Sequence, residues 1–259
     1  MVYLTDGSSH RNGVANEHAT VDFINRRSVA IRAALVPPGH TLVQVGGTRT
    51  KVDARVIKPD GNCGAEITIS IKNHTKGTFD WTNITRIEGV PSSLKEELKR
   101  FKAGCVPYPK TREEAEPFRD SFNDIFSQAL KSLENDDAFI RSVLRSCYEK
   151  NPEYLIVNNV VTGEYILART QESTPELATK NEHWNYFLKF GRGVTSGQVW
   201  RRCVHGKEVD TSLRLRLVSN NGLWAFFGPK GSVPCFKVQQ DGVDEFIRKL
   251  HEPVRETWT

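Results

Sequence analysis

The chain is 259 residues long, of which 38% are hydrophobic and 26% charged, and these values are ordinary for a folded globular protein. This length is enough for one large α/β domain or two smaller ones. No apolar run approaches the roughly 20 residues that a membrane helix needs, and the N-terminal residues lack the basic and apolar segments of a signal peptide. We therefore expect neither membrane insertion nor secretion, and an intracellular, cytoplasmic protein.

The positive charge of the chain is concentrated in its last third. The net charge is +5, but residues 189–237 contain nine Lys or Arg and two acidic residues, a local net charge of +7. Such a segment suits a polyanionic partner, because Lys and Arg displace counterions from phosphates; a merely solvated surface is the alternative. The five cysteines form no C-x-x-C pair, which argues against a disulfide framework or a zinc site and indicates reduced thiols.

The N-terminal part of the sequence predicts a helix followed by short strands. Residues 16–27 carry apolar side chains at helical spacing, and Asn16 is a suitable N-cap. Three β-rich runs follow, separated by glycine-containing breaks: residues 40–46, 51–57 and 65–73. We expect the last two runs to form a hairpin.

The rest of the chain turns first helical and then β-rich. Helices are predicted for residues 92–101, 112–133 and 136–150, and a hairpin for residues 154–168. Short strands are predicted for residues 197–204, 212–219, 222–228 and 233–240, and a final helix for residues 243–250. This order predicts an α/β fold in which the helices flank a sheet, followed by a β-rich C-terminal region.

A carboxylate and a lysine fall on adjacent strands of the first expected hairpin. Alternation along residues 65–73 puts Lys72 on the same face as Ser70, with the isoleucines on the core side, and Asp53 lies in the partner strand. Phosphodiester hydrolysis at neutral pH uses a divalent metal held by hard oxygen ligands. A lysine beside the metal can position or deprotonate the attacking water. Asp53 and Lys72 are therefore the candidate catalytic residues.

Three segments carry a family resemblance: HRNGVANEHATVDFIN in the first helix, TKVDARV in one strand and ITISIKNH in the next. Over about the first ninety residues, the chain resembles the PD-(D/E)xK nuclease superfamily, which includes many type II restriction endonucleases and archaeal Holliday-junction resolvases. By matching position, the resemblance implies that Glu17, Asp53 and Lys72 form one metal site. It also implies a central mixed β-sheet flanked by helices, and Mg²⁺ as the cofactor, with Mn²⁺ able to replace it.

The sequence departs from this family at Ser70, since an aspartate or glutamate is usual two residues before the lysine. Glu17 is the preferred source of the second carboxylate ligand. Glu66 is the alternative ligand, because it shares the face of Ser70, although four strand residues separate the two by roughly 13 Å. Asp60 would give a literal Pro-Asp match, but Pro-Asp-Gly is ordinary turn chemistry and we assign this residue to a turn.

DNA contacts are expected in two places. The polar segment that follows the lysine, expected to be a loop and a helix start, would place Asn73, His74 and Lys76 beside the scissile phosphate; a solvated loop histidine is the alternative for His74. In the basic third, groove contacts would come from arginine, asparagine and glutamine side chains, or the arginines would simply cover a solvated sheet face. The candidates there are Arg201, Arg202, Arg214, Arg216, Asn220, Asn221, Gln239 and Gln240.

Together these features predict a magnesium-dependent type II restriction endonuclease that cuts both strands of double-stranded DNA at a short specific sequence. Residues 1–180 would form the catalytic nuclease core, and residues 181–259 a basic β-rich region for DNA recognition or dimerisation. Cutting both strands of a symmetric site favours a homodimer. Two alternatives stay open: a structure-specific nuclease such as a junction resolvase, and a non-catalytic DNA-binding protein in which Ser70 marks a decayed site.

Overall fold

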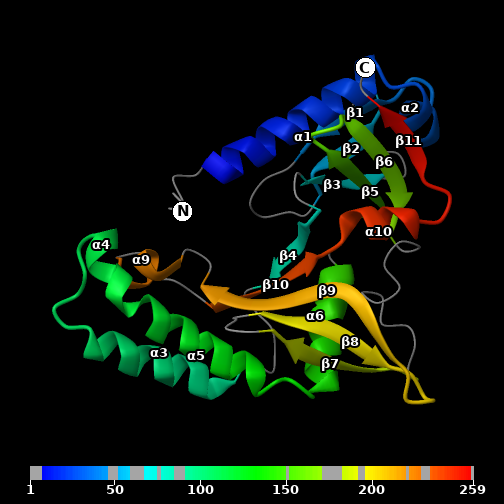
Figure 1. Cartoon of the computed structure of the whole chain (residues 1–259). Coiled ribbons are helices and arrows are strands. Elements are labelled where there is room, and N and C mark those ends of the chain that lie inside the picture. Colours follow the sequence, from blue (N-terminus) through cyan, green and yellow to red (C-terminus); the bar gives the residue numbers. More distant parts are fainter. Residues whose placement is uncertain are drawn as a thin grey trace. The chain divides into compact units, whose positions relative to one another are not determined.

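The computed structural model describes residues 8–45, 52–58, 67–74, 77–84, 91–149, 152–170, 183–191, 196–219, 222–228 and 234–257. The chain folds into two compact units (Figure 1). Unit 1 comprises residues 1–79, 148–175 and 242–259, and unit 2 comprises residues 80–147 and 176–241. Each unit is built around its own β-sheet.

A six-stranded mixed sheet forms the centre of unit 1. Its strands lie in the order β1 (Thr41–Gln44), β2 (Ala54–Ile57), β3 (Thr68–His74), β5 (Tyr154–Asn159), β6 (Glu164–Arg169) and β11 (Val254–Thr257). β3 and β5 are parallel, and the other neighbouring pairs are antiparallel. A parallel pair needs a long crossover, and here the chain between β3 and β5 supplies the first segment of unit 2.

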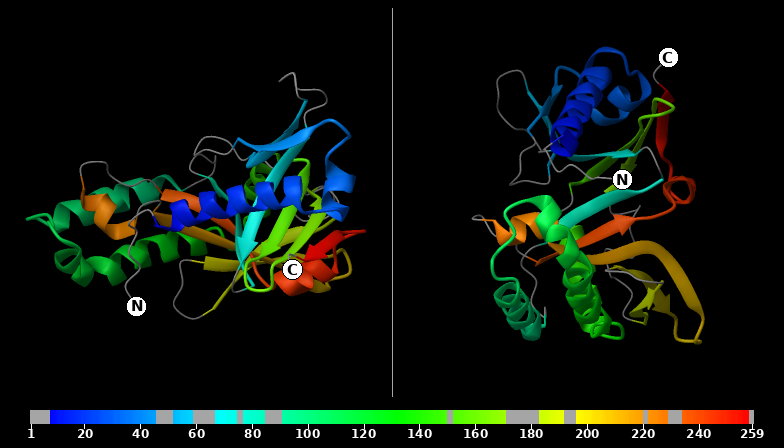
Figure 2. Two further views of the ribbon diagram at one scale, coloured as in Figure 1. Left: turned by 90° about the horizontal axis from the view of Figure 1, so that it is seen from above. Right: turned by 60° about the vertical axis from the view of Figure 1, so that its left-hand side comes forward.

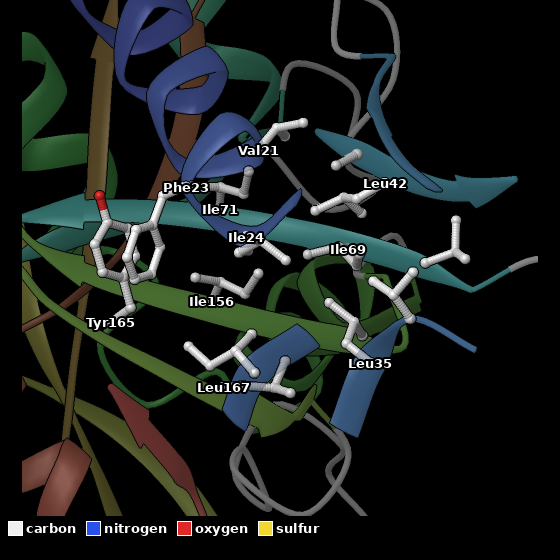
Figure 3. Close-up of a cluster of buried hydrophobic side chains, with 14 residues drawn as sticks. Val21, Phe23, Ile24, Leu35, Leu42, Ile69, Ile71, Ile156, Tyr165 and Leu167 are labelled. Atoms are coloured by element: carbon white, nitrogen blue, oxygen red, sulfur yellow. The ribbon is translucent and has the colours of Figure 1, made fainter. Parts of the chain in front are cut away.

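Helix α1 (Ser8–Arg26) packs on one face of this sheet. Its side chains Phe23 and Ile24 join a buried cluster with Ile69 and Ile71 of β3 (Figure 3). The ring of Phe23 stacks on that of Tyr165, with centroids 4.4 Å apart. Full burial of a large apolar side chain contributes about 1.5–3 kcal/mol, so this interface fixes which face of the sheet points inward.

A second helix of unit 1, α2 (Ala30–Leu35), is held by the last strand of the sheet. The carboxylate of Glu256 accepts hydrogen bonds from the hydroxyl of Ser28 and from the backbone amides of Val29, at 2.8 Å, and Ile31, at 3.2 Å. The first turn of a helix leaves amides without intrahelical partners, and a carboxylate there also interacts favourably with the helix dipole. Glu256 thereby joins β11 to the start of α2.

Unit 2 is built on a five-stranded sheet with one apolar and one polar face. Its strands lie in the order β4 (Phe79–Ile84), β10 (Pro234–Gln240), β9 (Glu208–Ser219), β8 (Ser196–Arg202) and β7 (Asn185–Phe190). Along β9, Leu213, Leu215 and Leu217 are buried, whereas the intervening Arg214 and Arg216 are half-buried. This alternation is the pattern of a sheet that packs against helices on one side only.

Helices of unit 2 pack on the apolar face. α5 (Arg119–Lys131) contacts β8 and β9, and α3 (Ser92–Gly104) lies beside α5 (Figure 2). α6 (Asp137–Glu149) brings Phe139 against Phe236 of β10, with ring centroids 5.0 Å apart. The short α4 (Arg112–Ala115), η1 (Glu116–Phe118) and α9 (Gly222–Phe227) surround a cluster of aromatic rings: Phe101, Phe118, Phe122, Phe226 and Phe227.

The outer edge of β7 is covered by the start of α6 and the turn before it. The backbone amide of Leu188 donates to the carbonyl of Glu134 at 2.8 Å, and that of Tyr186 donates to the carboxylate of Asp137 at 2.6 Å. Asp137 also accepts from Arg141 at 2.6 Å, and the guanidinium of Arg141 lies 4.9 Å from the centre of the Tyr186 ring. Both of these edge amides are therefore occupied within the unit.

Several predicted elements are confirmed and three are wrong. The β2–β3 and β5–β6 hairpins and the final helix, α10 (Val243–Arg248), are present. The segment expected to be a loop and a helix start forms β4, in which Trp81 is buried. The apolar run 222–228 forms α9 and not a strand, since short apolar runs suit either structure. The helix predicted over residues 112–133 is interrupted at Pro117, which has no amide hydrogen to donate.

The protein thus has a mixed α/β fold in which helices flank a mixed sheet. The two units divide the chain at four places, whereas the composition predicted one boundary near residue 180. The difference arises because the helices of residues 92–147 pack on the strands of the C-terminal third, and composition does not reveal this packing. Among the helices in the described ranges, none is both long and apolar enough to span a membrane.

Candidate functional site

The face of the unit 1 sheet that points away from α1 carries the predicted catalytic residues. Ala54 of β2 and Ile69 and Ile71 of β3 belong to the core beneath α1. Side chains alternate along a strand, so Asp53, Ser70 and Lys72 lie on the opposite face. We call these three residues the β3 polar face.

Asp53 and Ser70 contact one another directly. The Ser70 hydroxyl donates to Oδ2 of Asp53 at 3.1 Å, and the backbone amide of Ile71 donates to the same oxygen at 2.7 Å. The Asp53 amide still donates to the carbonyl of Ile69 at 2.9 Å, so the ladder between β2 and β3 passes from backbone to side-chain bonding at this residue. Both described donors converge on Oδ2, which leaves Oδ1 as the oxygen that can take a further ligand.

Lys72 follows Ser70 on the same face of β3. Two residues along a strand span roughly 7 Å, and a lysine side chain is long enough to reach back over that distance. Lys72 is half-buried, and within the described ranges no carboxylate forms an ion pair with it. Its ammonium group is therefore not neutralised by the described part of the chain.

Glu17, the preferred second metal ligand, lies on the other side of the sheet. Its carboxylate accepts a hydrogen bond from Nε2 of Gln44 at 2.9 Å. Gln44 is two residues from the buried Leu42 and shares its α1 side of the sheet. The structure thus brings Asp53, Ser70 and Lys72 together but puts Glu17 on the face of α1. Glu66, the alternative ligand, lies outside the described residues.

Asn73 and His74, which were expected beside the scissile phosphate, are part of β3 and not of a loop. Oδ1 of Asn73 accepts from the side-chain amide of Asn158 at 3.0 Å on the α1 side of the sheet. His74 is only 5% exposed, so the solvated loop histidine is wrong. Burial lowers the pKa of His74, although Asp244 and Glu164 raise it in part. Lys76 lies outside the described residues.

The predicted DNA-reading arginines lie on β8 and β9 of unit 2, and three of the four already have partners there. Arg214 pairs with Asp241 at 2.7 Å, and Arg202 pairs with Glu208 at 2.9 Å. The guanidinium of Arg201 lies 3.6 Å from the centre of the Trp184 ring. For Arg216, no carboxylate partner is present in the part of unit 2 that the structure describes.

The predicted glutamines of β10 have different environments. Gln239 lies opposite Arg214 and is half-buried. Gln240 is 3% exposed, and its side chain accepts from the indole of Trp81 at 3.2 Å and donates to the carbonyl of Ser212 at 3.2 Å. Gln240 is therefore a core residue and is wrongly predicted as a groove contact. Asn220 and Asn221 lie outside the described residues.

Two contacts at these sites escaped the sequence analysis. The Ile71 amide bonds to Asp53 only because the β2–β3 ladder ends there, and strand alternation gives no sign of where a ladder ends. Asp80 of β4 pairs with Lys237 at 3.6 Å, and its strand was not predicted. A buried aromatic residue next to an acidic one, as in Asp80-Trp81, was the available signal for that strand.

The β3 polar face suits a loosely held divalent ion better than a protein-enclosed one. Within the described ranges, no three carboxylate, histidine or cysteine side chains come together around one point. Magnesium sites often use one or two protein carboxylates, while water and substrate phosphates complete the shell. Oδ1 of Asp53 provides one such ligand. The donor set fits this second type of site, and Asp53 is the residue that would hold the ion.

Comparison of the sequence with models of known protein families finds no match, and comparison with curated proteins likewise finds no similar protein.

Proposed function

We propose that the protein is a magnesium-dependent DNA endonuclease of the restriction type, with the β3 polar face as its catalytic centre. The observation that carries the proposal is the placement of Ser70 and Lys72 of β3 on the same face as Asp53, the residue before β2, with Asp53 held by Ser70 and the Ile71 amide. The mixed sheet flanked by helices agrees with the fold that the family resemblance implies. These features support a restriction-endonuclease-like core.

Each residue of the face has a distinct task in this proposal. A bound Mg²⁺ would supply Lewis-acid polarisation of the scissile phosphate. Asp53 would hold the ion, and Ser70 and the Ile71 amide keep its carboxylate in one orientation. The ammonium of Lys72 orients the attacking water and stabilises negative charge that develops on the phosphate. Mn²⁺ should replace Mg²⁺, because the ligands are hard oxygen atoms.

DNA recognition is proposed for the polar face of the unit 2 sheet. Arg216 of β9 lies directly opposite Lys237 of β10, and Asp80 pairs with Lys237. Because Asp80 already neutralises Lys237, Arg216 is the cation of this pair that would contact an anion such as a DNA phosphate. Double-strand cutting by a cytoplasmic enzyme of this kind would use a homodimer, because each strand needs one active site.

Incubation of the purified protein with sequence-diverse plasmid or phage DNA tests the proposal. We expect discrete fragments in Mg²⁺ and none in EDTA, and sequencing of the fragment ends should reveal one short shared sequence. Asp53→Asn should abolish cleavage, whereas the control Asp22→Asn, which alters an exposed carboxylate of α1 paired with Arg26, should cut normally. Equal cleavage by the Asp53 variant would reject the site.

A non-catalytic DNA-binding protein is the second candidate, and one observation favours it. The bonds from Ser70 and the Ile71 amide to Asp53 also close the end of the β2–β3 ladder, which is a sufficient structural reason for the carboxylate. In that case, the protein would bind DNA without cutting it in Mg²⁺ or Mn²⁺. Asp53→Asn would then lower thermal stability and leave DNA binding unchanged.

A further inference from the structure

Ser70 stands where the family resemblance leads one to expect a second carboxylate. The side chain is 2% exposed, and its hydroxyl donates to Asp53. A buried hydroxyl needs a hydrogen-bond partner, and Asp53 is the acceptor that the fold provides. Position 70 therefore provides a hydroxyl that donates a hydrogen bond to Asp53, where a carboxylate would have added a second negative charge.

A carboxylate at position 70 would make a different site. It would lie across the ladder from Asp53, close to the 3.1 Å that now separates Ser70 Oγ from Asp53 Oδ2. Two carboxylates at that distance cannot both ionise unless a cation lies between them. Such a site is destabilised when the metal is absent. The Ser70 hydroxyl introduces no such repulsion, and its hydrogen bond to Oδ2 holds the Asp53 side chain in one orientation.

We infer that Ser70 is a positioning residue, and not a metal ligand, which holds the Asp53 carboxylate in one orientation before the metal arrives. The inference rests on the proposed function, since it concerns the same site. Its consequence is a site that is preformed without metal. Folding of unit 1 then does not depend on Mg²⁺, and Asp53 presents Oδ1 to the ion with no reorganisation.

The structural alternative is a buried serine that merely satisfies its own hydrogen bond. Three variants separate the two roles. Ser70→Ala removes the donor, Ser70→Thr keeps a hydroxyl, and Ser70→Asp restores the second carboxylate. Thr68→Ala is the matched control, because Thr68 lies on the same strand and face but accepts from the Glu153 amide, at 3.1 Å, and does not contact Asp53.

Two measurements are made on the full chain: Mn²⁺ affinity by electron paramagnetic resonance, and the thermal midpoint in EDTA and in Mn²⁺. Ser70→Ala should bind Mn²⁺ roughly tenfold more weakly, as is typical when a residue that orients a ligand is lost. Ser70→Thr should recover most of that affinity, and Thr68→Ala should equal the wild type. Ser70→Asp should melt below the wild type in EDTA, and Mn²⁺ should raise its midpoint by more than it raises the wild-type midpoint.

Two outcomes would overturn the inference while leaving the nuclease in place: wild-type Mn²⁺ affinity in Ser70→Ala, or a Ser70→Asp protein whose midpoint ignores the metal, each with normal DNA cleavage by the wild type. Loss of affinity in both the Ala and Thr variants would show that Ser70 acts through packing. A wild-type protein that neither binds Mn²⁺ nor cuts DNA would remove the proposed function and this inference together.

Discussion

The two sheets hold their charged residues in different ways. On the β3 polar face of unit 1, the carboxylate of Asp53 is bound by neutral donors, and Lys72 has no ion-pair partner in the described ranges. On the polar face of unit 2, Arg214 pairs with Asp241, and Lys237 pairs with Asp80. Charges that the fold itself neutralises act mainly in structure, whereas Asp53 and Lys72 have no ion-pair partner in the described ranges and stay available for a ligand.

The charge composition of a segment overstates the positive charge that is available to bind DNA. The segment 189–237 carries a net charge of +7 in the sequence, but two of its cations pair with Asp80 and Asp241, which both lie outside that segment. A window along the sequence cannot count partners that the fold brings in. On β9, Arg214 pairs with Asp241, whereas Arg216 has no carboxylate partner in the described part of unit 2. Arg216 therefore remains the candidate of this strand for a contact with DNA.

Among substitutions of charged residues on the two sheets, replacement of Lys72 should have the largest effect. We expect Lys72→Ala to slow DNA cleavage by about 10²–10³-fold, the usual cost of losing one group that stabilises developing charge. The matched control is Lys237→Ala, a half-buried sheet lysine whose charge is neutralised by Asp80. It should cut within about threefold of the wild type. Single-turnover cleavage rates measure both effects. Equal losses of rate in the two variants would contradict the distinction between a lysine that is unpaired in the described ranges and a neutralised one.

Glu256 tests whether a carboxylate held by neutral donors can be purely structural. Glu256→Gln should lower the free energy of unfolding by about 1–2 kcal/mol, because the start of α2 loses a charged cap, with no change in the cleavage rate. Chemical denaturation measures the loss. The exposed Glu252→Gln is the control and should be neutral.

The contribution of Glu256 should also depend on pH. Burial alone would raise its pKa, but the bonds from Ser28 and from the amides of Val29 and Ile31 outweigh burial and lower the pKa below the ordinary 4.5. A carboxyl group with a lowered folded pKa contributes fully above the pKa of the unfolded state and loses that contribution as pH falls through the folded value. The stability difference between wild type and Glu256→Gln should therefore be present at neutral pH and shrink below about pH 4.

Arg216 and Arg214 form a matched pair on one strand face. Arg216→Ala should weaken DNA binding about tenfold, within the range for loss of one arginine contact, while Arg214→Ala should weaken it less, because Asp241 competes for that guanidinium. Binding in Ca²⁺ at two salt concentrations measures both effects. A larger loss for Arg214 would mean that its ion pair opens on DNA.

The smallest effect is expected at the exposed charge cluster of β7, β8 and β9. Glu208 accepts from Lys189 at 2.7 Å and from Arg202 at 2.9 Å, and the Arg202 side chain is 53% exposed. Exposed pairs of this kind contribute little to stability, so Arg202→Gln should leave the free energy of unfolding almost unchanged. Salt should reduce even this difference, and thermal denaturation at low and high salt checks it.

Period-two patterns predicted much of the candidate site. The Ile69 and Ile71 pattern on β3 correctly places these residues in the core, and it follows that Ser70 and Lys72 share the other face. The side of Glu17 could not be predicted in this way, because it depends on the rotation of α1 over the sheet. That rotation is set by the packing of Phe23 and Ile24, which is a tertiary property.

From the sequence, α2, β7, β4 and β11 were not predicted, and the last two depend on partners far along the chain. β11 has only four residues, and it pairs with β6 from a place almost ninety positions further along the chain. β4 lies in a segment of polar composition, and its burial rests on Trp81 and the bond from its indole to Gln240. Local patterns carry no record of such pairings, so β11 could not be predicted from its own residues, and β4 offered only the aromatic side chain of Trp81 as a local signal.

The occupied edge of β7 limits how copies of this chain can assemble. The amides of Tyr186 and Leu188 are the donors that a strand from another molecule would need, and Asp137 and Glu134 already accept from them. Addition of a foreign strand at this point would require the start of α6 to detach first. Growth of the unit 2 sheet from one molecule into the next, whether into an ordered dimer or an aggregate, is therefore disfavoured at this edge.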